Sequence, residues 1–158
     1  MPALRELFTS AGFEDVRTYV QSGNIVLSSD ASPAQLARDS ERFLADQLGV
    51  SVAVIVRTRD ELAEVVRRNP LREVAVNPKR YQVSFLSAEP ASELIEKCAA
   101  IAAPQERVIG IGREIYAWHP EGVARSRLWA HLAGQGLGVT ATARNWTTVT
   151  TLLALADE

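Results

Sequence analysis

The sequence is poor in the residues that build metal centres and covalent cross-links. Its 158 residues include one cysteine, Cys98, and two histidines. A single cysteine excludes an intramolecular disulfide and a multi-cysteine metal site, and it suits the reducing cytoplasm, where we expect the protein to reside. No spacing of the histidines with acidic residues indicates a metal site, so we expect neither a metal nor a cofactor.

Long apolar runs and a strong positive charge are also absent. No run approaches the ~20 apolar residues that a membrane-spanning helix needs, and the N-terminus lacks the basic and apolar regions of a signal peptide. The formal net charge of -2 argues against a protein that coats nucleic acid over its whole surface. With 47% hydrophobic and 23% charged residues, the chain has the balance of a globular protein with its own core.

The stretch around Gly23 is the clearest structural signal in the sequence. Two runs of β-favouring residues, 16–20 and 25–27, flank the polar break Gln21-Ser22-Gly23-Asn24. Gly and Asn tolerate positive φ, so this break predicts a tight hairpin. Gln21, Ser22 and Asn24 are also candidate ligand-binding residues at its tip. The alternative is that they serve the turn alone, although a tight turn does not require a glutamine.

Apolar periodicity and capping residues divide the remainder of the chain into helices and strands. Ser32 and Gln35 form a capping box that begins a helix, and Gly49 ends it. The β-branched run from Ser51 to Arg57 predicts a well-buried strand. Further helices are predicted from near Met1 to residue 11 and at 59–69, 90–101, 126–133 and 146–156, and further strands at 81–86, 107–111, 114–118 and 139–143. The strands at 107–111 and 114–118 are joined at Gly112-Arg113 in a second hairpin.

This order of elements predicts an α+β protein with two ferredoxin-like (split β-α-β) lobes. The C-terminal lobe, residues 80–158, reads β-α-β-β-α-β followed by a last helix. The N-terminal lobe, residues 1–70, has the same order without the opening strand. Residues 71–79 carry no clear period and are bounded by prolines, so we expect them to connect the lobes.

Several stretches together resemble a known family. They include Tyr19-Val-Gln-Ser-Gly-Asn24, Arg125-Ser-Arg-Leu128 and Thr142-Ala-Arg-Asn-Trp-Thr147, and they are similar to the bacterial family catalogued as domain of unknown function 1697. The resemblance extends over essentially the whole chain. It implies two ferredoxin-like subdomains, and it brings no established activity.

The sequence departs from that family at its beginning. Members usually start with a further apolar strand and a glycine-rich loop ahead of the first helix, and this segment is absent here. In a ferredoxin-like sheet that strand is central, so each backbone group left buried and unpaired would cost ~1–3 kcal/mol. We therefore expect a misassigned start codon or a truncated chain. The alternatives are a sheet that closes differently, or a strand supplied by another chain, as in a homodimer.

The C-terminal segment carries the main functional hypothesis. From Gly122 to Ala156 there is no Asp or Glu, whereas the segment contains three arginines. It also contains two residues that can begin helices, Ser126 and Asn145. Free N–H groups at a helix start and guanidinium groups both favour anions. We therefore predict a site for an anionic small molecule or nucleic acid at Arg125, Ser126, Arg127, Arg144 and Asn145. The alternative is a solvated basic face with ordinary helix caps.

Two other classes of function remain open at this point. An enzyme would need a titratable group with a base partner, and the sequence identifies no catalytic residue. Ser126 has no evident base, and Cys98 falls on the inward face of its helix. A partner-binding module completed by a second chain is the third hypothesis.

Overall fold

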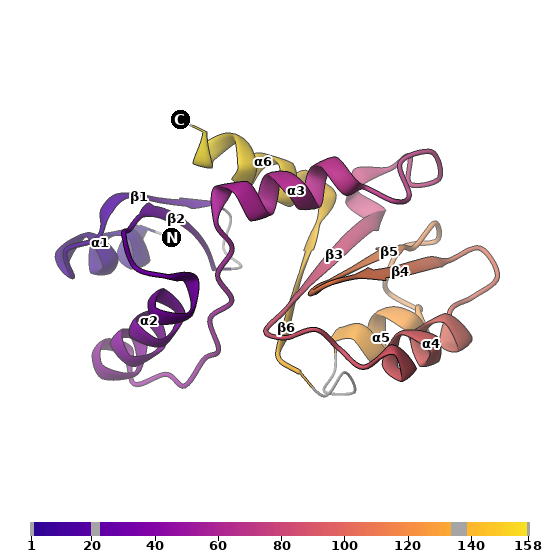
Figure 1. The fold of residues 1–158 in the computed structure, drawn as a ribbon, viewed down its shortest axis with the longest axis horizontal. Helices are drawn as coiled ribbons and strands as arrows, with labels where there is room; N and C mark the ends of the chain where they lie inside the picture. The colour runs from indigo at the N-terminus through magenta and orange to yellow at the C-terminus, as the bar shows by residue number, and fades with distance from the viewer. Residues whose placement is uncertain (1, 20–22, 134–138, 158) are drawn as a thin grey trace. The chain divides into compact units, whose positions relative to one another are not determined.

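The computed structural model describes residues 2–19, 23–133 and 139–157 (Figure 1). The chain forms two compact units. Unit 1 comprises Met1–Ala63 and Thr150–Glu158, and unit 2 comprises Glu64–Val149. Helices and antiparallel sheets are both present, so the protein is α+β. The boundaries between the two units fall within two helices. From the sequence we expected a connector at 71–79 between lobes 1–70 and 80–158.

Unit 1 contains the predicted hairpin between two helices. Its elements are α1 (Pro2–Ser10), β1 (Glu14–Tyr19), β2 (Asn24–Ser28) and α2 (Pro33–Leu48). The strands β1 and β2 are antiparallel and form a two-stranded sheet. Gly23 has a φ of 84°, which a residue with a side chain rarely adopts. The hairpin prediction is therefore confirmed.

Helix α2 begins and ends where the sequence predicts. The Ser32 hydroxyl accepts a hydrogen bond from the Gln35 N–H at 3.2 Å, which is the usual N-cap contact. At the other end Gly49 adopts the left-handed conformation that commonly closes a helix. The helix packs on α1 through Phe8 and Phe43, whose ring centroids lie 5.2 Å apart.

The strand predicted at Ser51–Arg57 is wrong. These residues belong to no strand, and Val52 is 47% exposed. Their composition favours a pleated surface, but a strand forms only where a neighbouring strand completes its hydrogen bonds. In the described part of the chain no strand pairs with them. The Val54 N–H instead donates to the Glu41 carboxylate at 2.9 Å.

Unit 2 is built on a four-stranded antiparallel sheet. The sheet has the order β4-β5-β3-β6. Its elements are a 3-10 helix η1 (Pro78–Arg80), β3 (Tyr81–Leu86), α4 (Ser92–Ile101), β4 (Arg107–Ile111), β5 (Glu114–Trp118), α5 (Arg127–Ala133) and β6 (Ala141–Asn145). The predicted order of strands and helices is confirmed, although β6 begins two residues later than expected.

Helices α4 and α5 cover one face of this sheet (Figure 1). The core on that face consists of buried side chains from both strands and helices, namely Leu86, Cys98, Ile115, Ala117, Leu128 and Leu132. Cys98 is fully buried there, and burial raises the pKa of its thiol. It is therefore a small core residue, as its helical position predicts.

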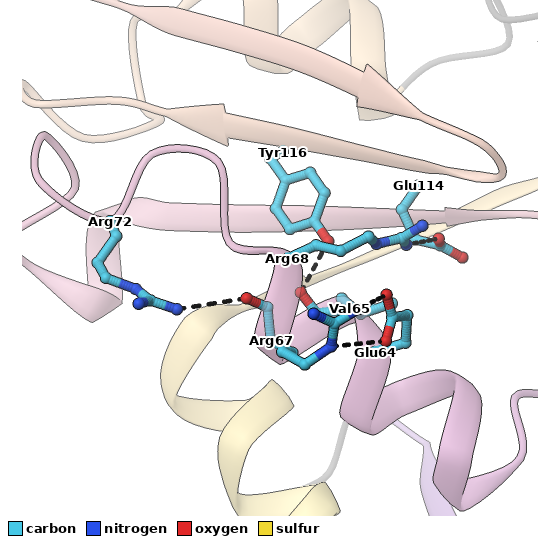
Figure 2. Close-up of polar contacts among 7 residues, drawn as sticks. All are labelled: Glu64, Val65, Arg67, Arg68, Arg72, Glu114 and Tyr116. Carbon is cyan, nitrogen blue, oxygen red and sulfur yellow. Dashed lines mark hydrogen bonds and ion pairs between the residues drawn. The ribbon is translucent and has the colours of Figure 1, made fainter.

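The opposite face of the sheet contacts the C-terminal half of α3 (Arg59–Arg68). The Tyr116 hydroxyl donates to the Val65 carbonyl at 2.8 Å, and Arg68 pairs with the buried Glu114 at 2.7 Å (Figure 2). Because both faces are covered, every residue of β3 and β5 is buried. Burial raises the pKa of Tyr116.

Two helices, α3 and α6 (Trp146–Ala156), each contribute residues to both units. Asn145 caps α6, because its side-chain carbonyl accepts the Thr148 N–H at 2.9 Å. Within unit 1, Arg59 of α3 pairs with Asp157 at 2.5 Å. None of the described helices has both the length and the apolar character that crossing a membrane requires.

Candidate functional site

A cavity of about 430 Å³ lies in unit 2, where the chain enters β4 and leaves β5. Three segments line it, namely the end of α4 with the turn before β4, the loop after β5, and the residues that begin α5. The lining residues are Ile101, Ala103, Gln105, Glu106, Pro120, Glu121, Gly122, Arg125, Ser126 and Arg127. Three of the predicted ligand-binding residues, Arg125, Ser126 and Arg127, therefore share one cavity wall.

A hydrogen-bond network of three side chains holds these segments together. Oε2 of Glu106 lies 2.7 Å from Nδ1 of His119 and accepts a hydrogen bond from the Ser126 hydroxyl at 2.5 Å. Oε1 of the same carboxylate accepts the Ala103 N–H at 2.9 Å. The Ser126 oxygen also accepts the Trp129 N–H at 3.0 Å and so caps α5. The network thus fixes the loop that carries Arg125 and Arg127.

The charge of this network is set by Glu106, which is 9% exposed. Burial raises the pKa of its carboxyl, but hydrogen bonds from Ser126, the Ala103 N–H and His119 outweigh burial, so the pKa lies below its usual value. The carboxylate is therefore ionised at neutral pH and acts as the acceptor. It follows that Nδ1 of His119 carries the proton that it donates to Glu106.

Glu106, His119 and Ser126 do not have the geometry of a serine hydrolase triad. In a triad the acid holds one imidazole nitrogen while the serine contacts the other. Here Ser126 lies 3.3 Å from Nδ1, the same nitrogen that faces Glu106. Nε2 of the fully buried His119 has no hydrogen-bond partner among the described residues. The arrangement supports a structural role for all three side chains.

Two other predicted residues, Arg144 and Asn145, lie on β6 and do not line the cavity. The Arg144 guanidinium donates to the Thr142 hydroxyl at 2.7 Å and to the Ala143 carbonyl at 2.8 Å. Burial lowers the pKa of Arg144. Asn145 is occupied by its cap contact on α6.

The hairpin residues belong to unit 1. The Asn24 amide donates to the Tyr19 carbonyl at 3.0 Å, and Asn24 is 7% exposed. This contact closes the hairpin, which is the turn role that we weighed for Asn24. Gln21 and Ser22 lie outside the described residues.

Sequence reasoning missed Glu106 and His119, although a signal for them existed. The hairpin of β4 and β5 was predicted with its turn at Gly112-Arg113, and Arg107 indeed pairs with Trp118. The residues one step further from the turn are Glu106 and His119, so the same register places them opposite each other. Ser126 joins them only through tertiary packing, for which the sequence offers no local signal.

Among the described residues, no group of three or more His, Cys, Asp or Glu side chains could hold a metal ion.

Comparison with known proteins gives a family without an assigned function. The family model described as "Protein of unknown function (DUF1697)" matches residues 1–116. The chain belongs to the DUF1697 family. The conserved bacterial protein SP0830 from Streptococcus pneumoniae has a similar structure, with a TM-score of 0.72 and 19% sequence identity over 99% of this chain and 88% of that chain. At that identity the likeness shows the fold alone. No curated protein matches the sequence.

Proposed function

We propose that this DUF1697 protein binds a small anionic, phosphate-bearing ligand in the cavity beside α5. The observation that carries the proposal is the placement of Arg125 and Arg127 on either side of Ser126 in the cavity wall. Arg125 and Arg127 are both exposed, and neither takes part in an ion pair among the described residues. A guanidinium without a carboxylate partner suits phosphate or carboxylate groups.

Two carboxylates, Glu106 and Glu121, also line the cavity, and among the described residues neither forms an ion pair with Arg125 or Arg127. The Glu106 carboxylate accepts hydrogen bonds from Ser126, His119 and the Ala103 N–H, so both of its oxygens are engaged inside the wall. Glu121 is the other carboxylate of the lining, and it is exposed to solvent, which screens it. In this proposal Ser126 positions the loop, and the two arginines contact the ligand.

Isothermal titration with inorganic phosphate and with AMP tests the proposal. Replacing Arg125 and Arg127 together by Gln should weaken binding at least ~10-fold, because a hydrogen bond to a charged group contributes ~1.5–3 kcal/mol. Arg72→Gln is the matched control, since Arg72 is also exposed and bonds only a backbone carbonyl, that of Arg67. Equal affinities of the double variant and the control would refute the proposal.

Arg144→Gln separates this cavity from the wider site that the sequence predicts. If the ligand is held at the cavity, Arg144→Gln should leave affinity within ~2-fold of the unaltered protein, a change below ~0.5 kcal/mol. A loss as large as that of the Arg125 and Arg127 variant would favour a site that includes β6.

We also propose that unit 2 is a ferredoxin-like lobe. Its support is the order β4-β5-β3-β6, in which the first strand lies between the third and the fourth, with one helix in each β-α-β connection. A ferredoxin-like origin for unit 1, a cytoplasmic location and a homodimer stay predictions. Sedimentation of the protein at several concentrations would test the homodimer.

A further inference from the structure

The lining of the cavity carries charges of both signs. Arg125 and Arg127 contribute two guanidinium groups, and Glu106 and Glu121 contribute two carboxylates. Within the described part of the chain, neither arginine pairs with either carboxylate. Because two cations stand against two anions, the formal charge of the lining is zero. A ligand with only negative charge would therefore be attracted by the arginines and repelled by the carboxylates.

The two carboxylates differ in what they leave for a ligand. Glu106 is 9% exposed, and both of its oxygens accept hydrogen bonds from groups in the cavity wall. Glu121 is exposed, and no ion pair among the described residues includes it. An ionised carboxylate only accepts hydrogen bonds, so it suits a ligand group that is positively charged and carries N–H donors. Glu121 is the carboxylate that is available to such a group.

Two consecutive turns fix the backbone at Glu121 and at Arg125. The Gly122 N–H donates to the His119 carbonyl at 2.8 Å and closes the turn that contains Glu121. The Ser126 N–H donates at 3.2 Å to the carbonyl three residues before it and closes the turn that contains Arg125. Hydrogen bonds of this kind define a β-turn. One ordered loop therefore presents a carboxylate and a guanidinium to the same cavity.

The rest of the lining limits the kind of molecule that fits. The cavity volume of about 430 Å³ lies within the range of small-molecule sites, roughly 300–1,000 Å³. Of the described residues that line the cavity, none is aromatic, so they offer no surface on which a nucleobase would stack. The cavity therefore matches a compact molecule without a nucleobase.

We propose that the ligand of this cavity carries both signs of charge and is a phosphate ester with an ammonium group. Arg125 and Arg127 bind the phosphate, and Glu121 binds the ammonium group. The Glu121 carboxylate then determines specificity instead of opposing binding. The inference rests on the proposed function and adds the class of ligand. A free aminoalkyl phosphate and the headgroup of an aminophospholipid share this chemistry.

Isothermal titration with phosphoethanolamine and with propyl phosphate, at about pH 8, tests the inference. The two ligands have the same shape, but propyl phosphate has a methyl group in place of the ammonium group. At this pH both phosphates are doubly ionised, since their second pKa is about 6, and the ammonium group stays protonated. Phosphoethanolamine should bind at least ~3-fold tighter, a gain typical of an exposed ion pair. Attraction to the arginines alone predicts the opposite order, because propyl phosphate has the larger negative charge.

Glu121→Gln tests which residue binds the ammonium group. This change should abolish the preference for phosphoethanolamine, and it should strengthen the binding of propyl phosphate because a negative charge leaves the lining. Glu89→Gln is the matched control, since Glu89 is also exposed, does not line the cavity and changes the net charge equally. The control should keep the preference. A preference that persists in Glu121→Gln would overturn the inference.

The outcomes distinguish this inference from the proposed function. If orthophosphate and both phosphate esters fail to bind, the proposed function itself is refuted. If the esters bind through Arg125 and Arg127, but propyl phosphate binds as tightly as phosphoethanolamine or more tightly, only the present inference is overturned. Replacing both arginines by Gln shows whether binding depends on them.

Vesicles distinguish the two sources of the ligand. Phosphatidylcholine vesicles are prepared with and without phosphatidylethanolamine, and co-sedimentation measures binding. Phosphatidylcholine is a suitable background because its quaternary ammonium group has no N–H to donate. Binding that requires phosphatidylethanolamine and is lost in Glu121→Gln would identify a lipid headgroup, whereas binding of phosphoethanolamine alone would identify a free aminoalkyl phosphate. Thermal unfolding of each variant verifies that a loss of binding is not a loss of fold.

Discussion

The two units differ in how many strands are available to pair, and this determines which segments become strands. In unit 2, β6 has the sequence Ala-Thr-Ala-Arg-Asn, which is a poor strand composition, yet it pairs with β3 over its whole length. In unit 1, residues 51–57 are rich in β-branched side chains, yet they form no strand. Whether a segment forms a strand therefore depends more on a neighbouring strand that completes its hydrogen bonds than on its residue composition.

The distribution of buried residues follows the same division. In unit 2 both faces of the sheet are covered, and most of the buried apolar side chains of the described chain lie there. In unit 1 the buried apolar side chains among the described residues are Phe8 and Leu44. We therefore expect substitutions in unit 2 to cost more stability than equivalent ones in unit 1.

The largest effect is expected at Ile115, which is fully buried in the core of unit 2. Ile115→Ala should lower the free energy of unfolding by ~2–5 kcal/mol, because it leaves a cavity between the sheet and its helices. Urea denaturation measures this loss. The same change at Ile25, which is only partly buried on β2, should cost less. Equal losses of stability at the two positions would contradict the expectation that unit 2 is the more sensitive to substitution.

An intermediate effect is expected at Glu106. Because its folded pKa lies below the unfolded value of about 4.3, its carboxylate stabilises the protein above that value, and the contribution is lost as pH falls through the lower folded pKa. Glu106→Gln should cost ~1.5–3 kcal/mol at neutral pH, since charged hydrogen bonds are lost. It should also reduce the loss of stability on acidification, which urea denaturation between pH 7 and pH 3 measures. An unchanged pH dependence would show that other carboxyl groups carry it.

The smallest effect is expected at Val52. Because this side chain is 47% exposed and belongs to no strand, Val52→Thr should change the free energy of unfolding by less than ~0.5 kcal/mol. Val83→Thr, on the fully buried β3, is the matched control and should be clearly destabilising. A large loss of stability at Val52 would indicate that residues 51–57 pair with another strand in solution. Strand formation in the two units would then be more alike.

The features that the sequence predicted correctly are those determined by neighbouring residues. The cap at Ser32, the cap at Asn145 and the turn at Gly23 each depend on contacts within a few residues. The wrong strand at 51–57 depends on a partner elsewhere, and composition alone does not reveal whether that partner exists. The predictions are therefore correct for features that contacts between neighbouring residues determine.

The candidate site was predicted in part for the same reason. Arg125, Ser126 and Arg127 are consecutive, so their shared wall could be expected, whereas Arg144 was grouped with them by charge alone. Ser126 meets Glu106 and His119 through tertiary contacts. These contacts depend on how the start of α5 packs beside the hairpin of β4 and β5, which no pattern in the sequence indicates.

The division of the chain between the units has a consequence for folding during synthesis. Unit 2 is one continuous segment, Glu64–Val149, whereas unit 1 joins the beginning of the chain to its last residues. Domains usually fold in the order in which the ribosome releases them. Unit 2 is therefore complete once Val149 has been synthesised. Unit 1 is complete only when the last helical turns of the chain have been added. Translation that stops shortly after Val149 would therefore yield a complete four-stranded unit and an unfinished companion.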